Sequence, residues 1–66
     1  MLGEIIYKLR INLKLSQKKL AERCGVTQQF IQRIEKGKVN PSINTVIKLA
    51  NALETTTDVI LGQKAG

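Results

Sequence analysis

The sequence of 66 residues contains no histidine and a single cysteine, Cys24. Histidine is the commonest general base and metal ligand in proteins, so its absence counts against a hydrolytic or metal-dependent enzyme. One cysteine can build neither an internal disulfide nor a zinc site, which makes a reducing, cytoplasmic setting the default. The chain also lacks a glycine-rich phosphate loop and an obvious pair of catalytic carboxylates. We therefore expect no enzyme, no metal and no cofactor.

Aromatic residues make up only 3% of the chain, and no apolar run approaches the roughly 18 residues that cross a bilayer. The first residues lack the basic and apolar segments of a signal peptide. A cationic helix that lies on a membrane would set Trp or Phe opposite a lysine-rich face, and this chain has one Phe and no Trp. The sequence thus predicts no membrane partner, and no small-molecule ligand is evident.

Acidic residues are few: 5 Asp and Glu stand against 11 Lys and Arg, for a net charge of +6. All of this excess lies in residues 1–38, whereas residues 39–66 are neutral. Such asymmetry indicates an anionic partner for the first part of the chain. The apolar content of 42% favours a folded chain, and the length allows one domain, 1–66. We expect its core at 4–62 and a frayed tail at 63–66.

The apolar residues recur at helical spacing, and no strand pattern appears. Ser16, Thr27 and Ser42 are suitable N-cap residues, Thr55 or Thr56 is another, and Gly25 and Gly37 suit helix ends. These signals predict an all-α fold of five short helices at about 4–12, 17–24, 28–36, 43–53 and 57–61. The expected inward residues are Ile5, Ile6, Leu9, Leu13, Leu20, Ala21, Cys24, Ile31, Ile34, Ile43, Val46, Ile47, Ala50, Leu53, Ile60 and Leu61.

The second and third predicted helices are two turns long and are joined by Gly25, Val26 and Thr27. Two short helices around such a turn form a helix-turn-helix unit, in which the second helix enters the major groove of DNA. With Ile31 and Ile34 facing the core, the outward residues of the third helix are rich in glutamine. Glutamine pairs with adenine and arginine with guanine through two hydrogen bonds, each pair contributing about 1–3 kcal/mol of discrimination. The candidate base-reading residues are Gln28, Gln29, Gln32 and Arg33.

Lys18 and Lys19 stand in the first turn of the second helix, where positive charge opposes the helix dipole at a cost of about 0.3–1 kcal/mol each. A DNA phosphate at this helix end would reverse that cost, because free N–H groups and lysines would share one anion. Solubility is the alternative reason for such lysines. Lys8 and Arg23 are interpreted as plain surface residues, and Cys24 as a small core residue.

Several segments in order resemble the phage repressor and Cro (XRE) class of helix-turn-helix DNA-binding domains. They are LSQKKLAE at 15–22, GVT at 25–27, IQRIEKG at 31–37, NPS at 40–42 and LANAL at 49–53. The resemblance covers about residues 4–62 and implies a five-helix, lambda-repressor-like fold. It also implies a cytoplasmic, bacterial or phage transcription regulator, most simply a repressor, which joins the nucleoid when bound to DNA.

The resemblance further implies a homodimer on a near-palindromic double-stranded operator, and a structural ion pair between Arg10 and Glu35. Gln17 matches a phosphate-anchoring position, and the loop 36–42 matches one that contacts the DNA backbone. Together with the reasoning from the helix ends, this gives the expected phosphate-binding set: Ser16, Gln17, Lys18, Lys19, Thr27, Lys36, Lys38, Asn40 and Ser42.

Three residues depart from the family pattern. Glu54 stands where glycine usually ends the fourth helix, Thr55 where an apolar residue is common, and Phe30 where some relatives have a small polar residue. The alternative function is a protein-interaction module on the same fold, such as an antitoxin. A stoichiometric protein partner in a pull-down would favour it over a DNA-reading regulator.

Overall fold

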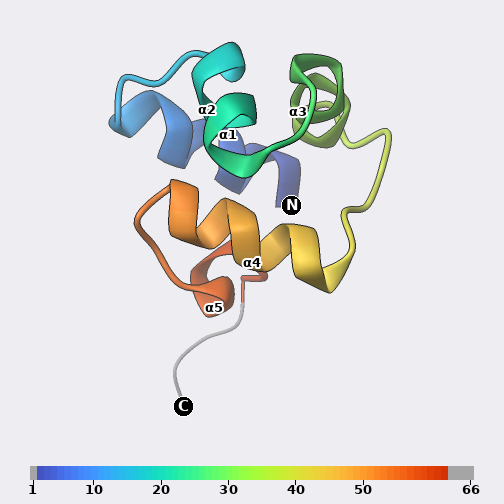
Figure 1. Ribbon diagram of the computed structural model, residues 1–66. Helices are drawn as coiled ribbons and strands as arrows, with labels where there is room; N and C mark the ends of the chain where they lie inside the picture. The colour runs from blue at the N-terminus through green and yellow to red at the C-terminus, as the bar shows by residue number, and fades with distance from the viewer. Residues whose placement is uncertain (1, 63–66) are drawn as a thin grey trace.

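Five helices, with no strand among them, make up the computed structural model, which describes residues 2–62 (Figure 1). The expected fold class is therefore confirmed. The expected tail at 63–66 lies outside the described residues. The expected bounds of α2 agree with the structure, while α1 begins two residues earlier and α3, α4 and α5 each end one residue earlier. The helices are α1 (Leu2–Asn12), α2 (Gln17–Cys24), α3 (Gln28–Glu35), α4 (Ile43–Ala52) and α5 (Thr57–Ile60).

Each of α2 to α5 begins at the hydroxyl side chain expected to cap it. Ser16 Oγ accepts from the Lys19 N–H at 3.0 Å, and Thr27 Oγ1 accepts from the Phe30 N–H at 3.1 Å. Ser42 and Thr56 cap α4 and α5 in the same way, which settles the choice between Thr55 and Thr56. These caps satisfy N–H groups that a helix leaves without a partner at its start.

The first four helices end in one motif, in which a residue in the left-handed region turns the chain. Gly25 and Gly37 fill this position after α2 and α3, as predicted. Lys14 and Glu54 fill it after α1 and α4, both with φ of 58°. The junction that follows α4 thus forms without the usual glycine. In each case the next N–H bonds a carbonyl five residues back: Leu15 to Arg10, Val26 to Ala21, Lys38 to Arg33 and Thr55 to Ala50, at 2.9–3.0 Å.

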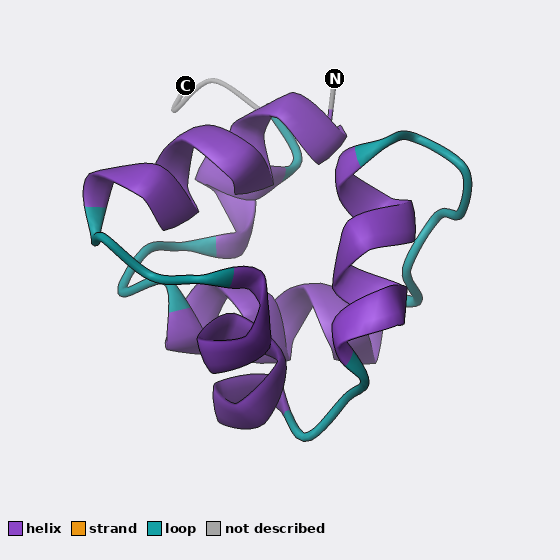
Figure 2. Cartoon of the chain, turned by 90° about the horizontal axis from the view of Figure 1, so that it is seen from above, coloured by secondary structure: helices purple, strands orange, loops and turns teal. Residues whose placement is uncertain are grey.

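A single apolar core joins the helices, which surround a common interior in the view of Figure 2. Among its side chains, Cys24 is buried, as predicted, and its thiol lies 3.8 Å from the carbonyl oxygen of Lys48. Desolvation raises the pKa of this thiol. The buried residues are Ile6, Leu20, Ala21, Cys24, Ile31, Ile34, Val46, Leu49, Ala50, Ala52, Leu53 and Ile60.

The buried face of α1 differs from the predicted Ile5, Leu9 and Leu13 stripe. Those three side chains are half-buried, and the residues fully turned inward are Ile6 and, unexpectedly for a glycine and an arginine, Gly3 and Arg10. The apolar stripe alone did not indicate this because the deciding contacts are polar and backbone contacts with α3. Gly3 lies against the end of α3, and Arg10 reaches Glu35.

Three predicted core residues are exposed instead. Ile43 and Ile47 are 59% and 45% exposed on the outer face of α4, and Leu61 is 43% exposed just after α5. Their helical spacing matched a core stripe, but α4 packs on α2 and α5 through Val46, Leu49 and Ala50. One face of a short helix satisfies those contacts, so the neighbouring isoleucines remain in solvent.

Arg23, expected on the plain surface, links α2 to the end of α4. Its Nη1 donates to the carbonyl oxygen of Ala52 at 3.2 Å and lies 3.8 Å from Glu54 Oε2. A cation near the carboxyl end of a helix stabilises the carbonyls there. No helix among residues 2–62 is long and apolar enough to cross a membrane.

Candidate nucleic-acid interface

The turn between α2 and α3 fixes the position of the predicted recognition helix. Gly25 has φ of 70°, the Val26 N–H bonds the Ala21 carbonyl at 3.0 Å, and Thr27 starts α3 in an extended conformation. The half-buried Val26 packs against the core between the two helices. The turn residues and the contacts between the two helices thus set how α3 lies against α2.

Helix α3 has one apolar and one polar face, as its sequence predicted. Ile31 and Ile34 are 0% and 1% exposed, which anchors the helix in the core. Phe30 is half-buried and packs against the same core, so it extends the anchor. The four candidate base-reading side chains all lie in solvent: Gln28, Gln29, Gln32 and Arg33.

The N-terminal end of α2 offers backbone donors to an anion. The Lys19 N–H already donates to the Ser16 hydroxyl oxygen, and the Leu20 N–H donates to the Ser16 carbonyl oxygen at 3.0 Å. The N–H groups of Gln17 and Lys18 lie in the first turn of α2, where no earlier turn of the helix provides a carbonyl oxygen to accept from them. Lys18 and Lys19 are exposed on the same turn, although Lys19 Nζ also lies 3.9 Å from Glu22 Oε1. A phosphate would supply the negative charge that this helix end lacks.

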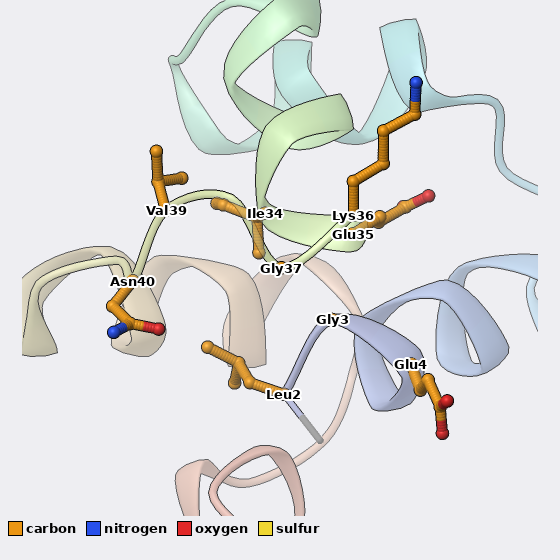
Figure 3. Close-up of a pocket in the computed structure, with 9 residues that line it drawn as sticks. All are labelled: Leu2, Gly3, Glu4, Ile34, Glu35, Lys36, Gly37, Val39 and Asn40. Atoms are coloured by element: carbon orange, nitrogen blue, oxygen red, sulfur yellow. The ribbon is translucent and has the colours of Figure 1, made fainter.

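The loop from α3 to α4 follows the end of the recognition helix and carries the remaining candidates. Lys36, Lys38, Asn40 and Ser42 are all exposed. A cavity of about 260 Å³ lies between this loop and the start of α1 (Figure 3). In that view the Lys36 side chain points away from the cavity into solvent. Leu2 of α1 and Val39 of the loop both line this cavity and pack against the core.

Arg10 and Glu35 form the expected ion pair, and it is almost buried, with side chains 9% and 6% exposed. Arg10 Nε and Nη2 donate to the two carboxylate oxygens at 2.7 and 3.0 Å. Hydrogen bonding to Glu35 raises the pKa of Arg10 against the opposing effect of burial. The Tyr7 ring covers the guanidinium, with its centroid 5.3 Å from Cζ.

Two further contacts of this pair were not predicted. Arg10 Nη1 donates to the carbonyl oxygen of Leu15 at 2.9 Å, which holds the loop before α2. Gln17 Nε2 donates to Glu35 Oε1 at 3.1 Å, so the first residue of α2 is joined to the last residue of α3. Gln17 lies 18 residues from Glu35, and no periodicity in the sequence links two such distant polar residues.

Within residues 2–62 no group of three or more side chains could hold a metal ion. The polar groups of this region are mostly uncharged amides, hydroxyls and cations on α2, α3 and the loop, and the carboxylates of Glu22 and Glu35 lie beside Lys19 and Arg10. Such an assembly suits a large, anionic, hydrogen-bonding surface. The architecture is that of a helix-turn-helix domain with an exposed amide-rich second helix.

Residues 6–60 match the helix-turn-helix family, and the chain belongs to it. The chain is 38% identical over 61 residues to the SPbeta prophage-derived HTH-type transcriptional regulator YonR of Bacillus subtilis, covering 92% of this chain and 56% of that one. It is 32% identical to the immunity repressor protein of Bacillus phage phi105, covering 94% of this chain and 43% of the repressor. The chain thus spans about half the length of these curated relatives.

Solved structures give the same fold. The DNA-binding domain of the P22 c2 repressor is similar with a TM-score of 0.90 and 30% identity, covering 92% of this chain and 80% of that one. The resemblance to phage repressors is therefore confirmed for both sequence and fold. The individual roles of the candidate side chains stay predictions.

Proposed function

We propose that this domain is a sequence-specific, double-stranded DNA-binding transcription regulator of the repressor type. The observation that carries the proposal is α3 itself, which buries Ile31 and Ile34 and exposes amide and guanidinium groups on its other face. The fold provides a rigid base, and the exposed groups are those that pair with base edges. Names of relatives as transcriptional regulators and as an immunity repressor support this assignment.

In this proposal α3 lies in the major groove with its N-terminal end toward the bases. Gln28, Gln29 and Gln32 offer paired donor and acceptor groups to adenine, and Arg33 offers two donors to guanine O6 and N7. Ser16, Gln17, Lys18 and Lys19 would bind phosphates at the start of α2. Thr27 and the loop residues Lys36, Lys38, Asn40 and Ser42 would bind further phosphates.

We further propose that the domain binds as a homodimer. One short recognition helix contacts few base pairs, and two copies on half-sites about 34–36 Å apart double the contact set. The exposed apolar side chains of Val59 on α5 and Leu61 just after it are candidates for the contact between copies. Residues 39–66 have no net charge, so this region of two copies can approach without electrostatic repulsion.

Selection of bound duplexes from a random DNA pool, at a stated salt concentration, tests the proposal. We expect enrichment of an inverted repeat with A·T and G·C pairs at the positions read by glutamine and arginine. Repeating the selection with a Gln28→Ala, Gln29→Ala double variant should lose that enrichment while non-specific binding persists. If no sequence is enriched by the wild-type domain, sequence-specific reading is ruled out.

Sedimentation of the domain with and without the selected duplex tests the dimer. We expect two copies of the wild-type domain to bind each duplex. A Val59→Asp variant should still bind one half-site but lose the cooperative binding of the second copy. A saturated complex with one copy per palindromic duplex would contradict the homodimer. A Lys8→Ala variant, altered on the exposed face of α1, serves as the control for a change in surface charge alone.

A further inference from the structure

The carboxylate of Glu35 accepts three hydrogen bonds from two different elements. Arg10 donates two of them from α1, and Gln17 Nε2 donates the third from the first turn of α2. The Glu35 side chain is 6% exposed, so water does not compete freely for these positions. Glu35 is therefore the point at which α1, the start of α2 and the end of α3 meet.

A carboxylate only accepts hydrogen bonds, and this fixes how the Gln17 amide is turned. The nitrogen of the Gln17 carboxamide must face Glu35, because the opposite orientation would set the amide oxygen against a carboxylate oxygen. One hydrogen of the amide NH₂ then points to Glu35 and the other is left for a second acceptor. An amide turned the other way would present its oxygen at the helix end, and an amide oxygen cannot donate a hydrogen bond to a phosphate.

The backbone at the same place also offers donors to an anion. The N–H groups of Gln17 and Lys18 have no acceptor within the helix, since Ser16 caps the N–H of Lys19. The positive end of the α2 dipole lies here as well. The second amide hydrogen of Gln17, the first residue of α2, is thus a side-chain donor at the same helix end as these backbone donors.

We propose that Glu35 is a positioning residue for DNA binding, acting through Gln17. It holds the Gln17 amide with the nitrogen inward, so that one N–H remains for a DNA phosphate at the start of α2. Arg10 neutralises the carboxylate, so the phosphate meets no uncompensated negative charge. This inference rests on the proposed function, because it assumes that a DNA phosphate occupies this helix end.

The arrangement also couples the two parts of the interface. Glu35 is the last residue of α3, whose exposed face carries the candidate base-reading side chains. A phosphate bound at Gln17 is consequently placed at a fixed position relative to α3. The register of the phosphate backbone against the recognition helix then depends on Glu35 rather than on the flexible lysines.

A double-mutant cycle of Gln17→Ala and Glu35→Gln, measured on a duplex selected by the wild-type domain, tests this inference. We expect each single change to weaken binding by about tenfold. In the Gln17→Ala background, Glu35→Gln should have little further effect, because the side chain it positions is gone. Effects that simply multiply would overturn the proposal.

The change in net charge gives a second test of the proposal. Glu35→Gln removes a negative charge, which by itself should tighten binding to DNA. Glu54→Gln removes the same charge at the exposed end of α4 and is the matched control. We expect tighter or equal binding for Glu54→Gln and weaker binding for Glu35→Gln at the same salt concentration. Tighter binding by both variants would overturn the proposal.

Nuclear magnetic resonance of the wild-type domain covers the case in which Glu35→Gln does not fold. The two Gln17 amide protons should differ more in chemical shift than those of the exposed amide of Asn51, and only the outer Gln17 proton should move when DNA is added. Gln17 protons that match those of Asn51 with and without DNA would overturn the proposal. If the wild-type domain binds no duplex at all, the proposed function fails first, and this inference fails with it.

Discussion

Gly3 of α1 lies directly against the carbonyl oxygen of Ile34 in the last turn of α3. A Cβ atom at Gly3 would lie 2.5 Å from that oxygen and 2.6 Å from the carbonyl oxygen of Glu35. The missing side chain therefore lets the two helices approach at the end of the recognition helix. The contact involves backbone atoms, which cannot turn aside as a side chain can.

We expect Gly3→Ala to destabilise the domain by about 1–3 kcal/mol, because α1 must move away from α3 to admit the methyl group. Urea unfolding followed by circular dichroism measures this loss. Lys8→Ala, on an exposed turn of the same helix, should change stability by less than about 0.5 kcal/mol. Equal stability of the Gly3→Ala variant and the wild-type domain would show that α1 packs differently.

Removal of Arg10 should be among the most damaging single changes in the domain. Arg10→Leu leaves the carboxylate of Glu35 buried without its partner, at a cost of about 3–5 kcal/mol. The double change Arg10→Leu, Glu35→Leu removes both charges and should recover much of that loss. Thermal unfolding of the wild-type domain and these two variants shows the pattern; a double variant less stable than Arg10→Leu would contradict it.

Sequence preference and general affinity for DNA should respond to different residues. Gln29→Ala should reduce the preference for the selected duplex by about 1–3 kcal/mol and leave non-specific binding nearly unchanged. Lys19→Ala should weaken binding to every duplex about equally and lower the salt slope by about 1. Titrations at several salt concentrations separate the two effects, and unchanged binding by both variants would contradict the proposed interface.

The end of α4 carries a residue in an unfavourable conformation. Glu54 adopts φ of 58°, which costs a non-glycine residue roughly 1–2 kcal/mol. Glu54→Gly removes that strain, but it also removes the exposed contact with Arg23 and raises the conformational entropy of the unfolded chain. We expect a net gain of about 0.5–1 kcal/mol, or a few degrees in Tm. A lower Tm would mean that the Arg23 contact outweighs the strain.

Stability should fall at high pH because of Cys24. Burial raises the pKa of its thiol, so the folded state keeps the proton to a higher pH than the unfolded state. The resulting stability is complete below the ordinary thiol pKa of 9.0 and is lost as pH rises above it. Cys24→Ala should flatten the pH dependence of unfolding between about pH 8 and 10 relative to the wild-type domain. If the stability of the wild-type domain and that of the Cys24→Ala variant change with pH in parallel, the Cys24 thiol is not the cause.

Much of the helical structure could be predicted because its signals are local. Ser16, Thr27 and Ser42 cap helices through bonds to residues three positions along, and Gly25 and Gly37 end them through their own backbone freedom. The solvent-exposed set on α3 also followed from local spacing, once Ile31 and Ile34 were placed inward. These features depend on neighbours within one helical turn.

The buried face of α1 and the outer face of α4 could not be predicted in the same way. Gly3 and Arg10 are fully buried beside Ile6, the expected Leu9 and Leu13 are only partly buried against the core, and Ile43 and Ile47 remained exposed. Apolar spacing gives the most hydrophobic face of a helix, but the helices available to pack against it decide which face is covered. The Arg10–Glu35 pair was expected only from the family resemblance.

By itself, the sequence determined that this chain is an all-helical domain with a lopsided positive charge and an amide-rich helix held by two isoleucines. Charge, caps and helical periods are properties of residues close together along the chain. Only the tertiary structure decided that Gln17 meets Glu35 and that Gly3 lies under Ile34. Those contacts join residues from different helices, and their geometry is set by how the helices pack rather than by any one of them.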